Sequence, residues 1–214
     1  NLGGKPLIAY TIIAAQRSKI NRAVVSSESE RIATVAREYG IDVIMSPKDL
    51  AQDNTPTLPV LKHVLSEIDD QYDNILTLQP TSPFRTNKHI NEAIELFESD
   101  RSADSLLSVV KVPHNYTPYS IMEKNKKGYL NNFIKQDNLV LRKQDKPVFY
   151  ARNSAISITR SKRLNGYIFG GNILPYCMDD ISSIDIDYKQ DVLFAETLIE
   201  IMKNNQINPE NYFF

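Results

Sequence analysis

Strand-like and helix-like segments alternate along most of this 214-residue chain, and no other feature of the sequence constrains its fold as strongly. Apolar residues recur at helical spacing from 6 to about 17, and RAVVSS at 22–27 predicts a short buried strand. Ser27 and Glu30 have the spacing of a capping box, which predicts that a helix begins here and that Gly40 ends it in the left-handed conformation.

The alternation continues to residue 111. Strands are expected at 41–46, 74–79 and 104–111, and helices from 55 to about 70 and from 87 to 99. Four such alternations are typical of an α/β fold with a Rossmann-like, mostly parallel sheet and helices on both faces.

Residues 112–160 interrupt this pattern. EKNKKGYL predicts a hairpin around Gly128, and AISITR predicts a later strand. Because a final helix is expected from about 188 to 203, we interpret 112–160 as a β-rich subdomain inserted in a single domain of residues 1–214.

Composition narrows the class of protein. A net charge of −1 without strong asymmetry predicts neither a nucleic acid nor a membrane as partner, and no apolar run has the length of a membrane span. Cys177 is the single cysteine and cannot form an internal disulfide, and the three histidines lack zinc-site spacing. A cytoplasmic protein is expected.

Polar segments follow three of the expected strands. Ligands of open parallel sheets bind beyond the carboxyl ends of the strands, which directs attention to SSESE, QPTSPFR and DIDYKQD.

SIDIDYKQD at 183–191 places Asp185, Asp187 and Asp191 close together. Ile184 and Ile186 alternate with the first two, which predicts a short strand carrying both carboxylates on one face. Two such carboxylates suit Mg²⁺ or Mn²⁺, and the alternative is a solvated helix cap.

QPTSPFR offers Gln79, Thr81, Ser82 and Arg85 as contacts for an uncharged, hydroxyl-rich ligand. A tight turn in which Thr81 or Ser82 satisfies the backbone is slightly favoured by the residues alone. Further along, Arg152 could pair a ligand carboxylate or phosphate, or one of the 26 acidic residues of the chain.

Together these segments resemble a known family. GGKPLIAYTI, VVSS with ERIATVAREYG, SPKDLAQD, LQPTSPFR, KQDKPVFYARNSAISI and SIDIDYKQD, in that order, are similar to the acylneuraminate cytidylyltransferases, or CMP-sialic acid synthetases. The resemblance covers nearly the whole chain.

The resemblance implies an enzyme that joins CTP to a nine-carbon 2-keto sugar acid, N-acetylneuraminate or a close relative, giving a CMP-sugar and pyrophosphate. It also implies a homodimer formed through residues 112–160. The site residues that it implies divide by role. Catalysis and Mg²⁺ (or Mn²⁺) binding fall to Asp185 and Asp187, and a metal-bound water or Asp187 accepts the proton. Gln79 contacts the sugar, and Arg152 acts in trans on the sugar acid. Thr55 and Thr57 fall where the family reads the base, and Asp191 supports the helix start or the second shell. The further substrate-binding residues are Thr81, Ser82, Arg85 and Asn153.

The sequence departs from the family in places. The opening strand and basic loop of the type I-x-A-R-x-x-S-K, which would cradle the triphosphate, are absent from the 214 residues, and we expect an additional segment that orders on ligand binding, the alternative being weak triphosphate binding. Ser46 replaces a frequent Arg, Ser154 a usual Gly and Ser157 a usual Tyr. These changes leave legionaminic acid or another diacetamido relative open as the substrate.

Two alternatives belong to other classes. Type A glycosyltransferases also place Asp-x-Asp on an α/β sheet, but only a short tail follows Asp187 here, whereas those enzymes need much more chain for the acceptor site. A non-catalytic nucleotide-binding module is the other alternative, and the absence of the basic triphosphate loop from the 214 residues suggests it.

Overall fold

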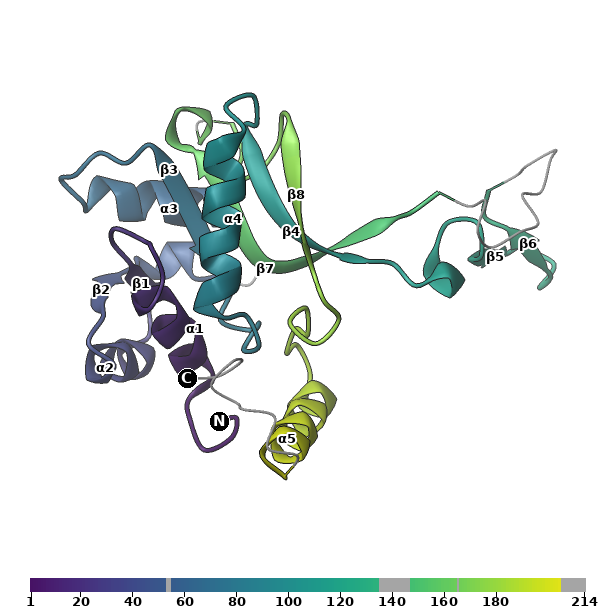
Figure 1. The fold of residues 1–214 in the computed structure, drawn as a ribbon, viewed down its shortest axis with the longest axis horizontal. Coiled ribbons are helices and arrows are strands. Elements are labelled where there is room, and N and C mark those ends of the chain that lie inside the picture. The colour runs from purple at the N-terminus through teal and green to yellow at the C-terminus, as the bar shows by residue number, and fades with distance from the viewer. Residues whose placement is uncertain (53–54, 135–146, 165, 205–214) are drawn as a thin grey trace.

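The computed structural model describes residues 1–52, 55–134, 147–164 and 166–204. They form an α/β body from which a thin arm projects (Figure 1). Short 3₁₀ turns are found at Lys48–Leu50, His114–Tyr116 and Ser161–Arg163.

The main sheet has the strand order β3-β7-β4-β8. β3, β4 and β8 run in one direction, and β7 lies antiparallel between β3 and β4. The expected α/β fold with a mostly parallel sheet is confirmed, with one strand reversed at its centre. The strands are β3 Asn74–Leu78, β4 Ser105–Lys111, β7 Tyr150–Arg160 and β8 Ile173–Met178.

A second, parallel sheet pairs β1 (Val24–Ser27) with β2 (Asp42–Met45), and α2 (Glu30–Glu38) connects them. The predicted capping box of Ser27 and Glu30 is wrong. Ser27 still belongs to β1, its hydroxyl accepts the N–H of Ser29 at 3.1 Å, and no side chain caps α2. Gly40 does end this region in the left-handed conformation, with φ 71°.

Helices cover both faces of the main sheet. α4 (Asn87–Ser99) packs on β4, β7 and β8 and also contacts α1 (Leu7–Gln16). Its first turn has a capping box between Thr86 and His89. α3 (Thr57–Ser66) lies behind β3 in Figure 1, on the opposite face from α4.

The segment before α5 (Lys189–Asn204) is not the predicted strand. Among the described residues no strand pairs with it, and a backbone hydrogen bond joins the N–H of Ile186 to the carbonyl of Thr81 at 2.8 Å. Ile184 and Ile186 nevertheless pack inward, in a cluster with Phe84 and the apolar side of α5.

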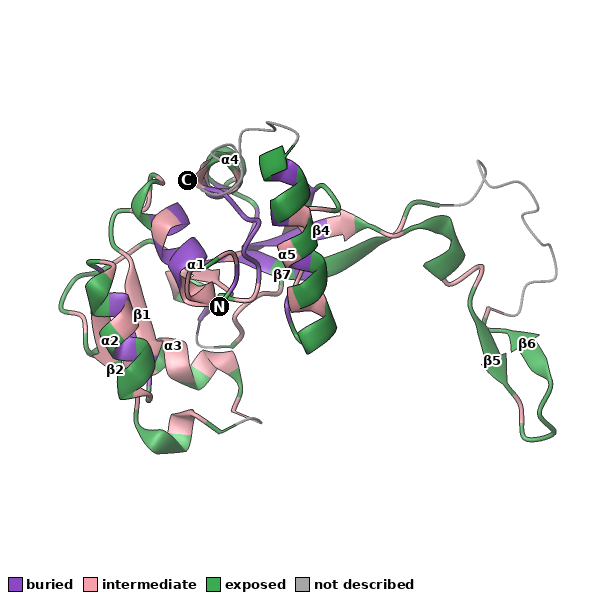
Figure 2. Ribbon diagram, turned by 90° about the horizontal axis from the view of Figure 1, so that it is seen from below, coloured by how far each residue is buried: buried purple, intermediate pink, exposed green. Residues whose placement is uncertain are grey.

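The arm carries the two-stranded sheet of β5 (Met122–Lys124) and β6 (Leu130–Asn132), with Gly128 at φ 90° in the turn as predicted. Its described residues are largely exposed (Figure 2). Residues 150–160, which we expected in the insertion, instead form β7 at the centre of the main sheet. None of the described helices is both long and apolar enough to cross a membrane.

Candidate active site

β7 bulges where it passes the carboxyl end of β3. Leu107 of β4 pairs with Ser157, but Val109 pairs with Arg152, so that on the β4 side residues 153–156 lie opposite Ser108 alone. Bulges of this kind bend a strand and redirect its side chains, and they are frequent beside active sites.

Two buried polar side chains hold the bulge. Ser108 donates to Asn153 Oδ1 at 2.5 Å and accepts the N–H of Ile156 at 2.7 Å. Asn153 also accepts the N–H of Ala155 at 3.3 Å and donates to the hydroxyl of Ser183 at 2.8 Å. Asn153 is 6% exposed, so its role is to shape the bulge from below.

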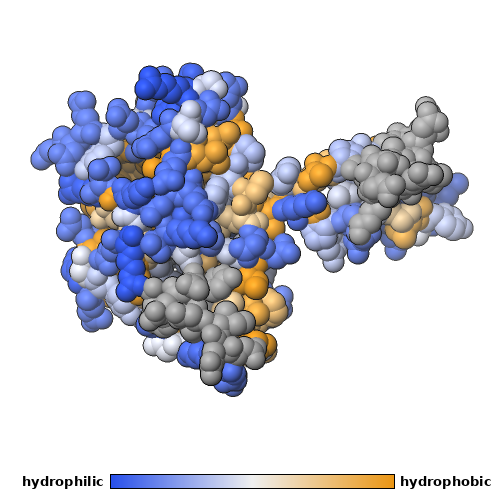
Figure 3. Space-filling model, viewed as in Figure 1, coloured by the Kyte–Doolittle hydropathy of each residue, from blue (hydrophilic) through white to orange (hydrophobic). Residues whose placement is uncertain are grey.

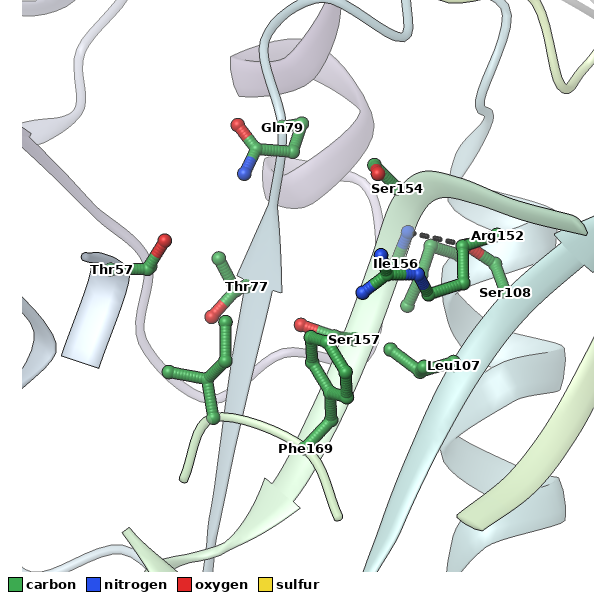
Figure 4. Close-up of a pocket in the computed structure, with 11 residues that line it drawn as sticks. Thr57, Thr77, Gln79, Leu107, Ser108, Arg152, Ser154, Ile156, Ser157 and Phe169 are labelled. Carbon is green, nitrogen blue, oxygen red and sulfur yellow. Dashed lines mark hydrogen bonds between the residues drawn. The ribbon is translucent and has the colours of Figure 1, made fainter. Parts of the chain in front are cut away.

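A pocket opens over the bulge, on the face of the sheet opposite α4. In the row that faces it, Thr77 pairs with Ser157, which pairs in turn with Leu107. Figure 4 shows the surrounding side chains. The pocket is lined by Thr57, Thr77, Gln79, Leu107, Ser108, Arg152, Ser154, Ile156, Ser157, Ile168 and Phe169.

Arg152 supplies the only charge among these lining residues. Its guanidinium carbon lies 5.2 Å from the centroid of the Phe169 ring, and Figure 4 shows the group extending into the pocket. No described carboxylate forms an ion pair with Arg152. An exposed cation among neutral hydrogen-bonding groups can bind an anion that also carries hydroxyl or amide groups.

Arg85 does not reach the pocket. It is 1% exposed, and it donates to the carbonyl oxygens of Gln79 at 3.0 Å and Ala155 at 2.9 Å and to the hydroxyl of Thr11 at 2.6 Å. Burial lowers the pKa of Arg85 to about 9. Arg85 therefore clamps the Gln79 loop to the bulge and α1, and it is not the ligand contact that we expected.

Thr81 and Ser82 of the QPTSPFR loop do not line the pocket either. Ser82 is 1% exposed and lies outside the pocket, whereas Thr81 offers its carbonyl to Ile186. That backbone bond and the bond between Ser183 and Asn153 join the segment of Asp185 and Asp187 to the loop after β3 and to the bulge.

Asp185 and Asp187 differ in their surroundings. Oδ1 of Asp185 is buried and has no hydrogen-bond partner among the described residues, whereas Asp187 is exposed. An unpartnered buried carboxylate oxygen is costly unless a cation satisfies it, so this oxygen of Asp185 suits a hard divalent ion. Among the described residues, no group of three or more Asp, Glu, His or Cys side chains could hold a metal ion.

Asp191 fixes the backbone that leads into α5. Its Oδ2 accepts the N–H of Asp187 at 3.1 Å and of Tyr188 at 2.7 Å. This is the support of the helix start that the sequence indicated.

Of the sequence-predicted contacts, Gln79, Thr57 and Arg152 come together in the pocket, and Thr55 lies outside its lining. Arg152 shares this pocket with Gln79 of the same chain, and its expected action in trans stays a prediction.

Sequence analysis missed Thr77 and Phe169. Thr77 had a signal, because it alternates with Leu76 and Leu78 and must face away from them. Phe169 had none, since only the fold brings it beneath Arg152.

Comparison with known proteins places the chain among cytidylyltransferases. A family model described as "Cytidylyltransferase" matches residues 1–211. The chain is 33% identical to the N-acylneuraminate cytidylyltransferase of Escherichia coli, over 94% of this chain and 48% of that protein. It is 34% identical to the CMP-N,N'-diacetyllegionaminic acid synthase of Legionella pneumophila, over 94% of this chain and 88% of the relative. The chain thus spans about half the length of the first relative and most of the second.

Solved structures confirm the fold. The chain superimposes on a CMP:2-keto-3-deoxy-manno-octonic acid synthetase in complex with CTP with a TM-score of 0.70 at 14% identity, covering 94% of this chain and 90% of the other. A 4-diphosphocytidyl-2C-methyl-D-erythritol synthase from Anaerococcus prevotii gives a TM-score of 0.62, also at 14% identity.

Proposed function

The chain belongs to the cytidylyltransferase family, and from this premise we propose that it joins CTP to a nine-carbon 2-keto sugar acid, releasing pyrophosphate and forming a CMP-sugar. The observation that carries the proposal is the guanidinium of Arg152, which forms no ion pair with any described carboxylate and lies among neutral side chains of the pocket. Such a pocket complements a ligand with one carboxylate and many hydroxyl or acetamido groups. The names of relatives that match most of this chain support the same substrate class.

Within this proposal, the main-sheet pocket holds the sugar acid. Arg152 pairs with its carboxylate, and Gln79, Thr77 and Ser157 hydrogen-bond its hydroxyl and amide groups. The ring of Phe169 supports the guanidinium and offers an apolar surface to the sugar. All of these groups come from one chain.

In this proposal the nucleotide binds near the start of α3 and near Asp185 and Asp187. Thr57 lines the pocket at the start of α3, and we assign it, with Thr55, to the cytosine side. Asp185 and Asp187 would hold Mg²⁺, with Mn²⁺ as a substitute. When bound, such an ion neutralises charge on the phosphates.

The reaction is a displacement at the α-phosphorus of CTP. The anomeric hydroxyl oxygen of the sugar acid attacks this phosphorus, a new P–O bond forms, and the bond to the β-phosphate oxygen breaks. Pyrophosphate leaves with the bonding electron pair, and Asp187 or a water accepts the hydroxyl proton. Arg152 contributes by holding the sugar acid so that its hydroxyl points at the phosphorus.

We place the enzyme in the cytoplasm as a homodimer. The single cysteine and the use of CTP support this compartment. The arm supports the dimer, because large apolar residues lie exposed along it, and Figure 3 shows some of this apolar surface. These exposed residues are Tyr116, Ile121, Met122, Tyr129, Leu130, Phe133, Val148 and Tyr150.

N,N'-diacetyllegionaminic acid is the second candidate for the sugar acid. The Legionella synthase of this acid matches over 88% of its own length, whereas the Escherichia coli N-acylneuraminate enzyme is matched over 48%. The identities of 33% and 34% do not separate the two acids, so both are carried into the experiment below.

Pyrophosphate release tests the proposal. The protein is incubated with Mg²⁺, each of the four nucleoside triphosphates, and N-acetylneuraminate, N,N'-diacetyllegionaminate or 3-deoxy-manno-octulosonate. We expect release only with CTP together with a nine-carbon acid. Release with another nucleotide, with the eight-carbon acid alone, or with none of the combinations would contradict it.

A further inference from the structure

Ser154 has an unusual backbone conformation for a serine. Its φ is 58°, and it is the only non-glycine residue with positive φ in the described parts of the chain. This conformation is unfavourable for residues with a Cβ atom and persists only where the surroundings impose it, often at functional sites.

The residues on both sides of Ser154 impose it here. Asn153 is fixed by Ser108 and Ser183. On the other side, the carbonyl of Ala155 accepts a bond from buried Arg85 at 2.9 Å. Because Asn153 and Ala155 are both held in place, the backbone of Ser154, which lies between them at the edge of the pocket, must adopt positive φ. Glycine would adopt the same conformation at lower cost.

The side chain of Ser154 is free to bind a ligand. The residue is exposed, lines the pocket, and makes no hydrogen bond to any described residue. Figure 4 shows its hydroxyl at the pocket edge, in the region between Gln79 and the guanidinium of Arg152. Serine at this position therefore brings a hydroxyl group to the pocket edge, which glycine would lack.

We propose that Ser154 is a specificity-determining residue, whose left-handed backbone presents its hydroxyl to a hydroxyl or acetamido group of the sugar acid next to the carboxylate bound by Arg152. This inference rests on the proposed function. The structure also distinguishes Ser154 from Asn153, because the amide of Asn153 is consumed within the bulge whereas the hydroxyl of Ser154 has no internal role.

Two variants separate the backbone from the hydroxyl. Ser154→Ala removes the hydroxyl and retains a Cβ atom at positive φ, whereas Ser154→Gly removes both. We expect the melting temperature of S154G to exceed those of the wild type and S154A, which should agree with each other. Equal melting temperatures for all three would overturn the claim of strain, whatever the activity.

Kinetics test the hydroxyl. We expect both variants to raise the KM for the preferred sugar acid about fivefold to tenfold, the usual worth of one neutral hydrogen bond. The KM for CTP and kcat should stay within about twofold of the wild-type values. The ratio of kcat/KM for N-acetylneuraminate to kcat/KM for N,N'-diacetyllegionaminate should move toward one by about the same factor as the KM rises. Ser99→Ala, at the exposed end of α4, is the matched control and should change nothing.

Each outcome separates this inference from the proposed function. If the wild type releases pyrophosphate and both variants retain its sugar-acid KM and selectivity, the inference is wrong and the function stands. A rise in KM in S154G alone would assign the effect to the backbone and also refute the hydroxyl contact. If the wild type itself is inactive with every sugar acid, both fail together.

Discussion

The two faces of the main sheet are built from the same strands but serve different purposes. On the α4 face, Leu76 pairs with Ile158, which pairs with Leu106, and this row lies in the apolar core. The next residue on each strand points to the other face, and the row of Thr77, Ser157 and Leu107 faces the pocket. Because side chains alternate between faces, adjacent residues can carry stability and binding separately.

Substitutions in neighbouring positions should therefore have separable effects. Changes on the α4 face should lower the free energy of unfolding and leave KM unchanged. Changes at the pocket or at Asp185 and Asp187 should alter kcat or KM and leave the free energy of unfolding unchanged.

Asp187→Asn should have the largest effect, on turnover alone. The substitution removes one negative charge from the proposed metal site, and we expect kcat to fall about a thousandfold, or about 4 kcal/mol in activation free energy. Asp187 is exposed, so the melting temperature should stay within about 2 °C of the wild type. Pyrophosphate release and thermal unfolding measure the two quantities. Near-normal turnover would remove Asp187 from the metal site.

Ile158→Ala should act on stability alone. Ile158 is 2% exposed in the core beneath α4, and truncating it should lower the free energy of unfolding by about 3 kcal/mol through lost burial and a residual cavity. Urea unfolding measures this change.

The neighbouring Ser157→Ala is the matched control for this substitution, because Ser157 faces the pocket. It should change the unfolding free energy by less than about 0.5 kcal/mol. Equal destabilisation by both would show that the two faces are not separated.

Arg152→Ala should weaken binding of the sugar acid. Losing a charge-assisted bond to a carboxylate costs about 2.5 kcal/mol, so the KM for the sugar acid should rise about 70-fold while the KM for CTP changes little. Steady-state kinetics with each substrate varied in turn measure both constants.

Mixing R152A with D187N tests whether Arg152 acts within its own chain. Because the proposed function assigns both residues to the site of one chain, mixed dimers should regain no activity. Recovery toward half of wild-type activity would mean that Arg152 serves the other chain's site.

Tyr176→Phe should have the smallest effect. The hydroxyl of Tyr176 donates to Glu92 of α4 at 2.6 Å on the core side of the sheet, and removing it should cost about 1 kcal/mol in unfolding free energy. Urea unfolding should detect this loss, and a change in sugar-acid KM instead would link the α4 face to binding.

Local patterns predicted much of the fold. Helix 87–99 has the bounds that we expected, because its apolar periodicity lies between clear turn residues. Pairing over long sequence distance was not predictable in this way. Nothing local indicates that 150–160 inserts antiparallel between β3 and β4, and this strand was therefore assigned to the insertion.

The site was predicted in part for the same reason. The sequence predicts Gln79, Thr57 and Arg152 as contacts, and they line the pocket. It also predicts Arg85 from its place in the loop that follows a strand, but Arg85 is buried. Its burial follows from the carbonyl oxygens of Gln79 and Ala155, which only the folded chain brings together. The conformation of Ser154 likewise depends on anchors far away in sequence.

The most direct measurement is a crystal structure of the protein with the sugar acid that supports pyrophosphate release. We expect the carboxylate of the sugar acid within about 3 Å of the guanidinium of Arg152, in the pocket that Gln79 of the same chain lines. A sugar acid bound outside this pocket, or contacted by Arg152 of a second chain, would contradict the assignment of the polar sheet face as the sugar-acid site.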